Sequence, residues 1–277
     1  MSESAPRNRY RNAIRRPSDR IILSVHRMEW LEAHHAMKET KQNIGRVAID
    51  SRNYEHGWKM RIAVATDAGS VPAMADAQLH GMPNDVGDEV RTLTTLRAGF
   101  ITVHATGGSA MLEAAVRGRD DGLAILEKRI GAPVDDRLGG LLALTVPTTM
   151  SREECLEIYG KEPEKAVLDL AFVALKSGMD GIVCSGRDLE CVGAYTELDR
   201  LVKVVAGVRP QGELWEGWAP PRHSDDQVRT VTPVEAILLG ADYLQIGAPI
   251  THPPEGVTRA VAAQSILSEI TAALAVR

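Results

Sequence analysis

The sequence contains few cysteines, no long apolar run and no large excess of charge of either sign. Its three cysteines, Cys155, Cys184 and Cys191, do not make a disulfide framework, and their spacing fits no zinc knuckle. A net charge of -5 gives no support for nucleic acid or an anionic membrane as the main partner. No apolar stretch reaches the roughly 18 residues needed to span a membrane. We therefore expect a globular protein of a reducing compartment, the cytoplasm.

The sequence also lacks low-complexity linkers, internal repeats of fixed period and a dinucleotide-binding fingerprint. The Gly107-Gly108 pair is too short for such a fingerprint, because the Rossmann spacing is absent. The first residues are polar and basic, and no apolar segment of signal-peptide type follows them. We expect residues 1–20 to form a polar arm, with an oligomer contact as the alternative, and residues 21–277 to form a single domain.

What the sequence does contain is an alternation of short apolar segments and helical ones. The apolar runs predict eight strands, at residues 21–25, 46–49, 71–75, 100–103, 140–146, 181–184, 203–205 and 243–246. Helical segments are predicted at residues 28–41, 58–66, 85–98, 109–117, 123–130, 164–176 and 232–239, the last with Thr230 or Thr232 as its N-cap. Eight strands alternating with helices predict an α/β protein, a single (β/α)8 TIM barrel, a fold that takes about 250 residues.

The most informative stretch, residues 75–86, reads ADAQLHGMPNDV and follows the third predicted strand. Polar residues just past the carboxyl end of a parallel strand are where chemistry usually sits in such proteins. The stretch resembles the signature loop of the orotidine 5'-monophosphate decarboxylase family, Asp-x-Lys-x-x-Asp-Ile-Pro-Asn-Thr, and Asp76, Pro83 and Asn84 match it. The resemblance continues in order at residues 101–108, 144–150, 181–186, 206–212, 226–247 and 248–251.

Three positions of the loop depart from the family pattern. Gln78 stands where the family has its lysine, Gly81 where it has its second aspartate, and Asp85 where it has its threonine. In the family this lysine protonates the carbon that loses carbon dioxide, and an amide is no useful acid. The resemblance implies a TIM barrel of the ribulose-phosphate-binding type and a homodimer, in which Gly81, Met82 and Asp85 reach the partner's site.

The first two strands depart from the family as well. The first strand of the family ends in Ala-Leu-Asp, and the matching residues here are Ser24, Val25 and His26, so a histidine replaces the aspartate. The second strand of the family carries a lysine. Alignment by the following Gly57 places that lysine near Val47, so this lysine is also lost.

These substitutions leave three hypotheses for the site. In the first, His26 is the acid or base and Asp76 orients it, because imidazole titrates near neutral pH. In the second, His26, Asp76 and His104 bind a divalent metal, since two imidazoles and a carboxylate are a common ligand set. In the third, the site binds a ligand without turning it over. His104 matches a family histidine for which a structural role is an equal interpretation, and His80 is interpreted as a surface residue.

The residues expected at a phosphate group are only partly retained. Gln211 matches the family's phosphate glutamine, and Gly207 and Gly247 match the glycines that let the backbone approach an anion. The family's phosphate arginine is replaced by Ala248, which removes a bidentate cation. The arginines that could compensate are Arg209, Arg222 and Arg229, and structural ion pairing is the default interpretation of the last.

Ring recognition is the remaining expectation. Thr149 matches the family serine that contacts the pyrimidine, so a hydroxyl is kept. The segment 211–226 between the seventh strand and its helix is longer than usual and contains Trp215 and Trp218. These tryptophans either stack on a ligand ring or pin the segment to the barrel rim or to a second subunit.

The resemblance therefore implies a carbon–carbon lyase with an altered active site, acting on a pyrimidine nucleotide, nucleoside or similar polar ligand. One alternative is a catalytically inactive homologue that serves as a ligand-binding or scaffold protein. The other is a metal-dependent lyase that uses His26 and Asp76. We expect no cofactor outside the metal alternative, and the expected partners are a small-molecule ligand and a second copy of the chain.

Overall fold

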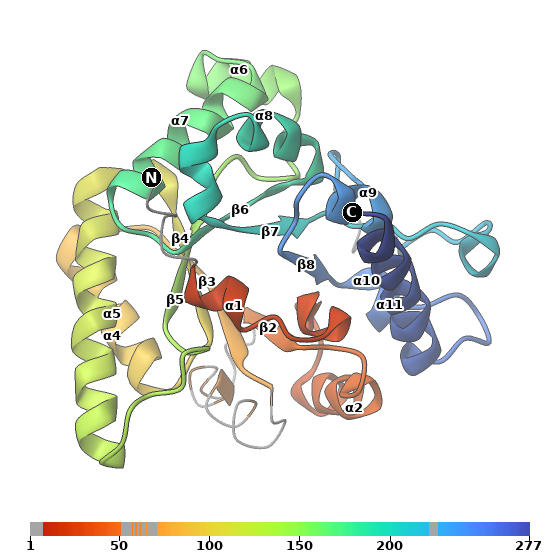
Figure 1. Ribbon diagram of the computed structural model, residues 1–277, viewed down its shortest axis with the longest axis horizontal. Helices are drawn as coiled ribbons and strands as arrows, with labels where there is room; N and C mark the ends of the chain where they lie inside the picture. The colour runs from red at the N-terminus through yellow and green to blue at the C-terminus, as the bar shows by residue number, and fades with distance from the viewer. Residues whose placement is uncertain are drawn as a thin grey trace.

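Eight short parallel strands close into a barrel in the computed structural model of the chain, and helices surround it (Figure 1). The strands are β1 (Ile21–Ser24), β2 (Arg46–Asp50), β3 (Ala73–Leu79), β4 (Phe100–His104), β5 (Gly140–Leu144), β6 (Gly181–Ser185), β7 (Val202–Ala206) and β8 (Tyr243–Ile246). The structure describes residues 8–50, 57, 59, 61, 62, 65, 71–221 and 227–277. Neighbouring strands pair in sequence order, and β8 pairs with β1 to close the barrel. The predicted TIM barrel is confirmed.

Helices cover the outside of the barrel and connect its strands. The α-helices whose bounds lie within the described residues are α1 (Arg9–Asn12), α2 (Trp30–Thr40), α4 (Pro83–Thr95), α5 (Gly108–Ile130), α6 (Arg152–Tyr159), α7 (Pro163–Lys176), α8 (Leu189–Gly193), α9 (Pro233–Leu238), α10 (Ala248–Thr251) and α11 (Arg259–Val276). Thr232 is the N-cap of α9, where its hydroxyl accepts a hydrogen bond from the Glu235 backbone N–H. The helix predicted at residues 58–66 lies largely outside the described residues.

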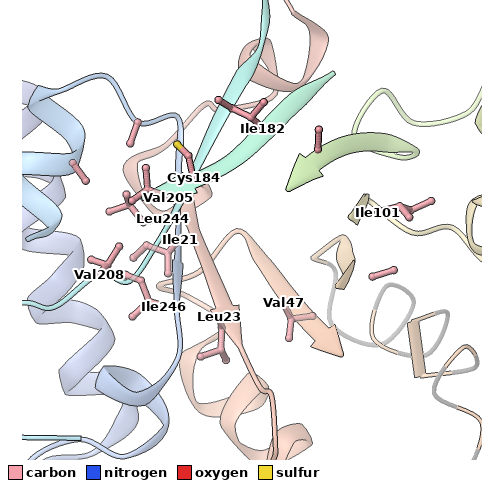
Figure 2. Close-up of a cluster of buried hydrophobic side chains, with 14 of the residues drawn as sticks. Ile21, Leu23, Val47, Ile101, Ile182, Cys184, Val205, Val208, Leu244 and Ile246 are labelled. Carbon is pink, nitrogen blue, oxygen red and sulfur yellow. The ribbon is translucent and has the colours of Figure 1, made fainter. Parts of the chain in front are cut away.

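Alternation along each strand divides the apolar side chains into two cores. Side chains such as Ile22, Met74 and Phe100 point into the barrel and fill its lower interior. Side chains one position along, such as Leu23 and Val47, point outward and pack beneath the helices (Figure 2). Since successive strand residues face opposite ways, this arrangement determines which polar residues at the strand ends can face the barrel mouth.

The described part of the N-terminal arm packs across the amino ends of the strands. Tyr10 is fully buried, and its hydroxyl donates to the Leu138 carbonyl oxygen at 3.1 Å. The Tyr243 hydroxyl donates to the Tyr10 carbonyl oxygen at 2.6 Å, and the Arg11 guanidinium contacts Asp242 at 2.8 Å. Residues 8–20 thus bind the chain's own barrel, an arrangement that the two sequence interpretations of this segment did not include.

One long helix replaces the two that the sequence predicts at residues 109–117 and 123–130. Gly118 and Gly122 suggest a break, but α5 continues through both. A Cβ atom at Gly118 would lie 2.1 Å from the Gly87 carbonyl oxygen of α4, and one at Gly122 would lie 2.7 Å from Thr94 Cβ. These glycines therefore allow α4 and α5 to pack closely, and this contact offsets their low helix propensity.

The C-terminal helix α11 has no counterpart among the predicted helices. It is the one helix of the described residues that is long and apolar enough to cross a membrane, with 18 residues and a mean hydropathy of 1.2. The sequence prediction found no apolar run of this length, because polar residues such as Gln264, Ser268 and Glu269 interrupt the alanines. α11 packs against α2, α9 and α10 and so forms part of the helical layer around the barrel (Figure 1).

Candidate active site at the carboxyl ends of the strands

A cavity of about 450 Å³ opens at the carboxyl ends of the strands. Residues from β1, β3, β4, β5, β6, β7 and β8 or their following loops line it, so the barrel brings together segments far apart in sequence. Its polar lining includes His26, Asp76, Gln78, His104 and Thr149, all expected at the site from the sequence. A volume of several hundred Å³ is the usual size of a small-molecule site.

A bulge in β3 shapes the floor of this cavity. The sequence predicts that this strand ends at residue 75, but β3 continues to Leu79. Ala75 pairs with Ile101 and Leu79 pairs with Val103, so four steps along β3 oppose two along β4. Gln78 adopts a left-handed φ of 49°, and its backbone N–H donates to Thr102 Oγ at 2.9 Å. Bulges of this kind re-aim side chains, here those of residues 76 to 78.

The Asp76 carboxylate lies on the cavity floor and is only 4% exposed. Its Oδ1 accepts a hydrogen bond from the Thr102 hydroxyl at 2.8 Å, and its Oδ2 accepts one from Gln245 Nε2 at 3.0 Å. Burial by itself would raise the pKa of Asp76, but His26, Thr102 and Gln245 together lower that pKa to about 2. The carboxylate is therefore ionised at neutral pH and serves as a fixed negative charge.

His26 follows β1 and faces this carboxylate. Its Nε2 lies 3.2 Å from Asp76 Oδ2, a distance typical of an ion pair when the imidazole is protonated. The Nε2 atom is buried, and no hydrogen bond of acceptable geometry satisfies it, so the contact is electrostatic rather than a linear hydrogen bond. His26 also lines the cavity, so its imidazole lies between the carboxylate and the space open to a ligand.

His104, at the end of β4, lines the cavity beside His80. The two rings lie 5.8 Å apart with an edge-to-face geometry, and His80 is exposed while His104 is half-buried. Burial, and then the neighbouring His80, lower the pKa of His104 despite the opposing effect of Asp76. His104 is therefore neutral at neutral pH and can both donate and accept hydrogen bonds.

The second strand supplies no lysine to the site. Val47, where the alignment placed the family lysine, points outward into the apolar core (Figure 2). Asp50 is 2% exposed and lies in register with Asp76, so its side chain is on the same face of the sheet. Lys59, the first lysine after β2, contacts Glu89 at 2.7 Å. Among the described residues no lysine lines the cavity.

Gly207 and Gly247 line the cavity just past the ends of the neighbouring strands β7 and β8, together with Ala248 and Arg209. Gly207 has a left-handed φ of 73°, and a Cβ atom there would lie 3.0 Å from the Arg229 carbonyl oxygen. Only glycine fits such a position without strain. Three arginines were expected to compensate for Ala248. Of these, Arg209 lines the cavity, and Arg222 lies outside the described residues.

The other two polar residues expected at the phosphate group lie elsewhere. Arg229 is buried away from the cavity lining and forms an ion pair with Asp188, whose other oxygen accepts the Ser185 backbone N–H. The ion pair therefore favours a structural role for Arg229 over a role in phosphate binding. Gln211 is exposed and does not belong to the cavity lining, and its backbone N–H instead contacts Glu269 on α11.

The two tryptophans after β7 pin their segment to the barrel rim. Trp215 is buried, and its indole N–H donates to the Ser265 hydroxyl of α11 at 3.3 Å. The Trp218 indole N–H donates to the His252 carbonyl oxygen at 3.0 Å. Neither belongs to the lining of the main cavity, so this conformation favours the pinning interpretation over ring stacking.

Asp85 lies in the first turn of α4, exposed and outside the lining of this cavity. This placement leaves the expected contact with a partner's site as a prediction. The metal hypothesis receives no support, because no group of three His, Cys, Asp or Glu side chains among the described residues could hold a metal ion. The three cysteines are free thiols.

Three residues at or beneath the cavity escaped the sequence interpretation. Thr102 and Gln245 hold Asp76, and Arg27, with a left-handed φ of 61°, lines the cavity beside His26. The inward alternation of β4 and β8 is the signal that could have identified Thr102 and Gln245. Arg27 had no such signal, because it lies in a loop.

Comparison with known proteins agrees with this geometry. The model of the family described as "Orotidine 5'-phosphate decarboxylase / HUMPS family" matches residues 28–263 of the chain. The orotidine 5'-phosphate decarboxylase of Gluconobacter oxydans (strain 621H) is 35% identical over 216 residues, covering 76% of this chain and 80% of that protein. The protein of the same name from Anaeromyxobacter sp. (strain K) is 30% identical over 250 residues, covering 90% of this chain and 99% of that protein.

A solved structure agrees at the level of the fold. The orotidine 5'-phosphate decarboxylase from Lactobacillus acidophilus superposes with a TM-score of 0.70 at 23% identity, over 90% of this chain and 98% of that one. Family membership rests on the sequence matches, which extend over most of the chain. The chain belongs to the orotidine 5'-phosphate decarboxylase / HUMPS family.

Proposed function

We propose that this chain is a carbon–carbon lyase in which His26 transfers the proton, acting on a pyrimidine nucleotide or nucleoside. The observation that carries the proposal is the buried His26 Nε2, which lies 3.2 Å from the ionised Asp76 and has no linear hydrogen bond. An imidazole next to a fixed carboxylate is a suitable general acid, whereas Gln78, at the position of the family lysine, is not.

The proposed step is a decarboxylation. The bond between the ring carbon and its carboxylate breaks, carbon dioxide leaves, and the electron pair stays on the carbon. The protonated His26 then donates a ring proton to this carbon, and solvent reprotonates the imidazole. Asp76 stabilises the imidazolium before the transfer, and Thr102 and Gln245 hold Asp76 in place.

The anionic part of the ligand would lie at the end of the cavity formed by Gly207, Gly247 and Arg209. Glycines allow the ligand close to the backbone, and a guanidinium supplies a permanent positive charge for a phosphate. Thr149 lines the cavity and is exposed, so its hydroxyl is accessible to a ring substituent. These features favour a nucleoside monophosphate over an uncharged ligand.

A non-catalytic ligand-binding protein is the second candidate, and the absence of lysine from the described cavity lining favours it. We infer a homodimer for either candidate, because Met82 is 70% exposed and Asp85 lies beside it at the start of α4. A cytoplasmic location fits the three free cysteines. Sedimentation of the purified protein would measure the subunit number.

The first test is a titration of uridine monophosphate, uridine and orotidine monophosphate, followed by thermal unfolding. A ligand at about 100 times its Kd stabilises the folded state by about 2.7 kcal/mol, which raises the Tm by about 5 °C or more in a protein of this size. We expect the monophosphates to raise the Tm more than uridine does. A Tm unchanged by all three would refute the nucleotide assignment.

The second test separates the lyase from the binder. The lyase releases carbon dioxide from orotidine monophosphate, and His26→Asn lowers kcat by about 10²- to 10⁴-fold with KM little changed. The binder shows a Tm increase with the same ligand but no release of carbon dioxide. Addition of a chelator should leave both results unchanged, since no metal takes part in the proposed step.

A further inference from the structure

A second hollow lies on the barrel rim, separate from the cavity described above. It has a volume of about 430 Å³ and is lined by residues 216–219 and 221 of the segment after β7 and by residues 252–255 after α10. We name it the rim groove. His252 lines both the rim groove and the main cavity, so the two hollows adjoin.

The walls of the rim groove are built from anchored and rigid residues. Trp218 is fixed by its hydrogen bond to the His252 carbonyl oxygen, and its ring lies 5.4 Å from the ring of Trp215 at an angle of 78°. Trp215 is buried and bound to Ser265. Three lining residues are prolines, whose φ angle is restricted. An indole held in this way needs little ordering when a ligand binds.

The charge of the rim groove has one sign. Glu216 and Glu255 contribute exposed carboxylates from its two opposite segments, and none of its described lining residues is lysine or arginine. A carboxylate pair across an indole ring suits a ligand with a diffuse positive charge, because the ring face attracts cations and the carboxylates attract them further. An anionic ligand, such as the nucleotide proposed for the main cavity, would be repelled.

We propose that the rim groove binds an organic ammonium ion, with Trp218 as the aromatic contact and Glu216 and Glu255 as the charge partners. The site is independent of the reaction proposed for His26. It takes a ligand of the opposite charge from the one expected at Gly207 and Arg209, so the two hollows select different chemical groups.

The test uses choline as the probe and 3,3-dimethylbutan-1-ol as its neutral isostere, with the full-length protein. The readout is the nitrogen-15 NMR signal of the Trp218 indole, assigned by its loss in Trp218→Phe. We expect choline to shift this signal in a saturable manner and the neutral alcohol to leave it unshifted. Equal shifts with both probes, or no shift with choline, would overturn the proposal.

Variants that remove the charges complete the test. Both glutamates are exposed, so their substitution should not impair folding. Glu216→Gln and Glu255→Gln should each weaken choline binding about two- to fivefold. Glu213→Gln, an exposed carboxylate of the same segment outside the groove, is the matched control and should not change it. Unchanged affinity in the double variant E216Q/E255Q would contradict the assigned charge partners.

Two further measurements distinguish this site from the main cavity. Asp76→Asn should leave choline binding unchanged, since Asp76 lines only the main cavity. Saturating uridine monophosphate should not displace choline. Displacement, or loss of choline binding in the Asp76 variant, would place choline in the main cavity and overturn the rim-groove assignment, whatever the outcome for the proposed lyase.

Discussion

His26 Nε2 and Asp76 Oδ2 lie 3.2 Å apart on the floor of the barrel cavity, and no other carboxylate among the described residues lines that cavity. His26 follows β1 and Asp76 lies in β3, and β2 lies between these two strands, so the curvature of the barrel brings the two side chains together. Gln245 from β8 and Thr102 from β4 fix the carboxylate from either side. The charge at the centre of the site is therefore held by two hydrogen-bond donors and by the electrostatic contact with His26, from three segments.

The low pKa of Asp76 predicts a pH dependence of stability. The folded pKa of about 2 lies below the ordinary value of 3.8, so ionised Asp76 stabilises the fold above pH 4, and this contribution is lost as the pH falls through 2. Its size is about 2 kcal/mol. Urea unfolding of the wild type and Asp76→Asn should differ most at pH 7 and converge at the acid end. A difference in unfolding free energy that does not vary with pH would contradict the low pKa of Asp76.

The conformation of Gln78 predicts a stabilising substitution. A left-handed φ of 49° costs energy in a residue with a side chain, so Gln78→Gly should raise the free energy of unfolding by about 0.5–1 kcal/mol. Gln78→Ala removes the same amide but keeps the strain, and it should not stabilise. Chemical denaturation measures both variants. A destabilised glycine variant would mean that the Gln78 side chain contributes more to folding than the strain costs.

Arg209 predicts a selective effect on phosphate binding. If its guanidinium contacts the phosphate, Arg209→Met should weaken the binding of uridine monophosphate by about tenfold or more, because a hydrogen bond to a charged group is worth about 1.5–3 kcal/mol. The affinity for uridine should not change. Isothermal titration calorimetry measures both affinities. Ala248→Arg adds the charged side chain expected from the family pattern and should tighten binding of the monophosphate, whereas Ala248→Met controls for size. An equal loss of affinity for the nucleotide and the nucleoside in Arg209→Met would rule out a phosphate contact.

The burial of Tyr10 predicts that the N-terminal arm contributes to the stability of the fold. This side chain is fully buried against Phe100, with ring centroids 5.4 Å apart, and Tyr10→Ala should lower the free energy of unfolding by about 3–5 kcal/mol. Tyr10→Phe loses the hydrogen bond that the hydroxyl donates to the Leu138 carbonyl and the one that it accepts from the Arg9 guanidinium, and should cost about 1–2 kcal/mol. Asn12→Ala, an exposed change in the same helix, is the control and should stay within about 0.5 kcal/mol. Urea unfolding compares them.

Glu269 predicts the opposite pH dependence from Asp76. Burial raises the pKa of this carboxyl to about 7 despite a hydrogen bond from the Gln211 backbone, and its Oε1 has no hydrogen-bond partner. Its folded pKa is above the unfolded value, so stability is highest below about pH 4.5 and falls as the pH rises through 7. Glu269→Gln should therefore stabilise the protein at pH 8, by about 1 kcal/mol because partial exposure weakens the effect, and change little at pH 4.5. Equal Tm differences at both pH values would disprove the linkage.

The local sequence pattern was sufficient to predict the strands and several residues that line the cavity. Short apolar runs separated by helical segments predicted all eight strands, because a strand buried on both faces needs consecutive apolar residues. The loop at residues 75–86 also identified Asp76 and Gln78. Local pattern failed at Gly118 and Gly122, where the close approach of α4 overrides helix propensity, and at Tyr10, whose aromatic ring is buried within a polar segment.

The sequence by itself determined the family and the barrel, because these depend on residue identity and order along the chain. Tertiary structure alone decided that Gln245 and Thr102 hold Asp76, that Trp215 and Trp218 bind the rim, and that Arg209 rather than Arg229 faces the cavity. The physical reason is that barrel closure brings distant strand ends together, and the β3 bulge changes which side chains face inward. Neither effect is local in sequence.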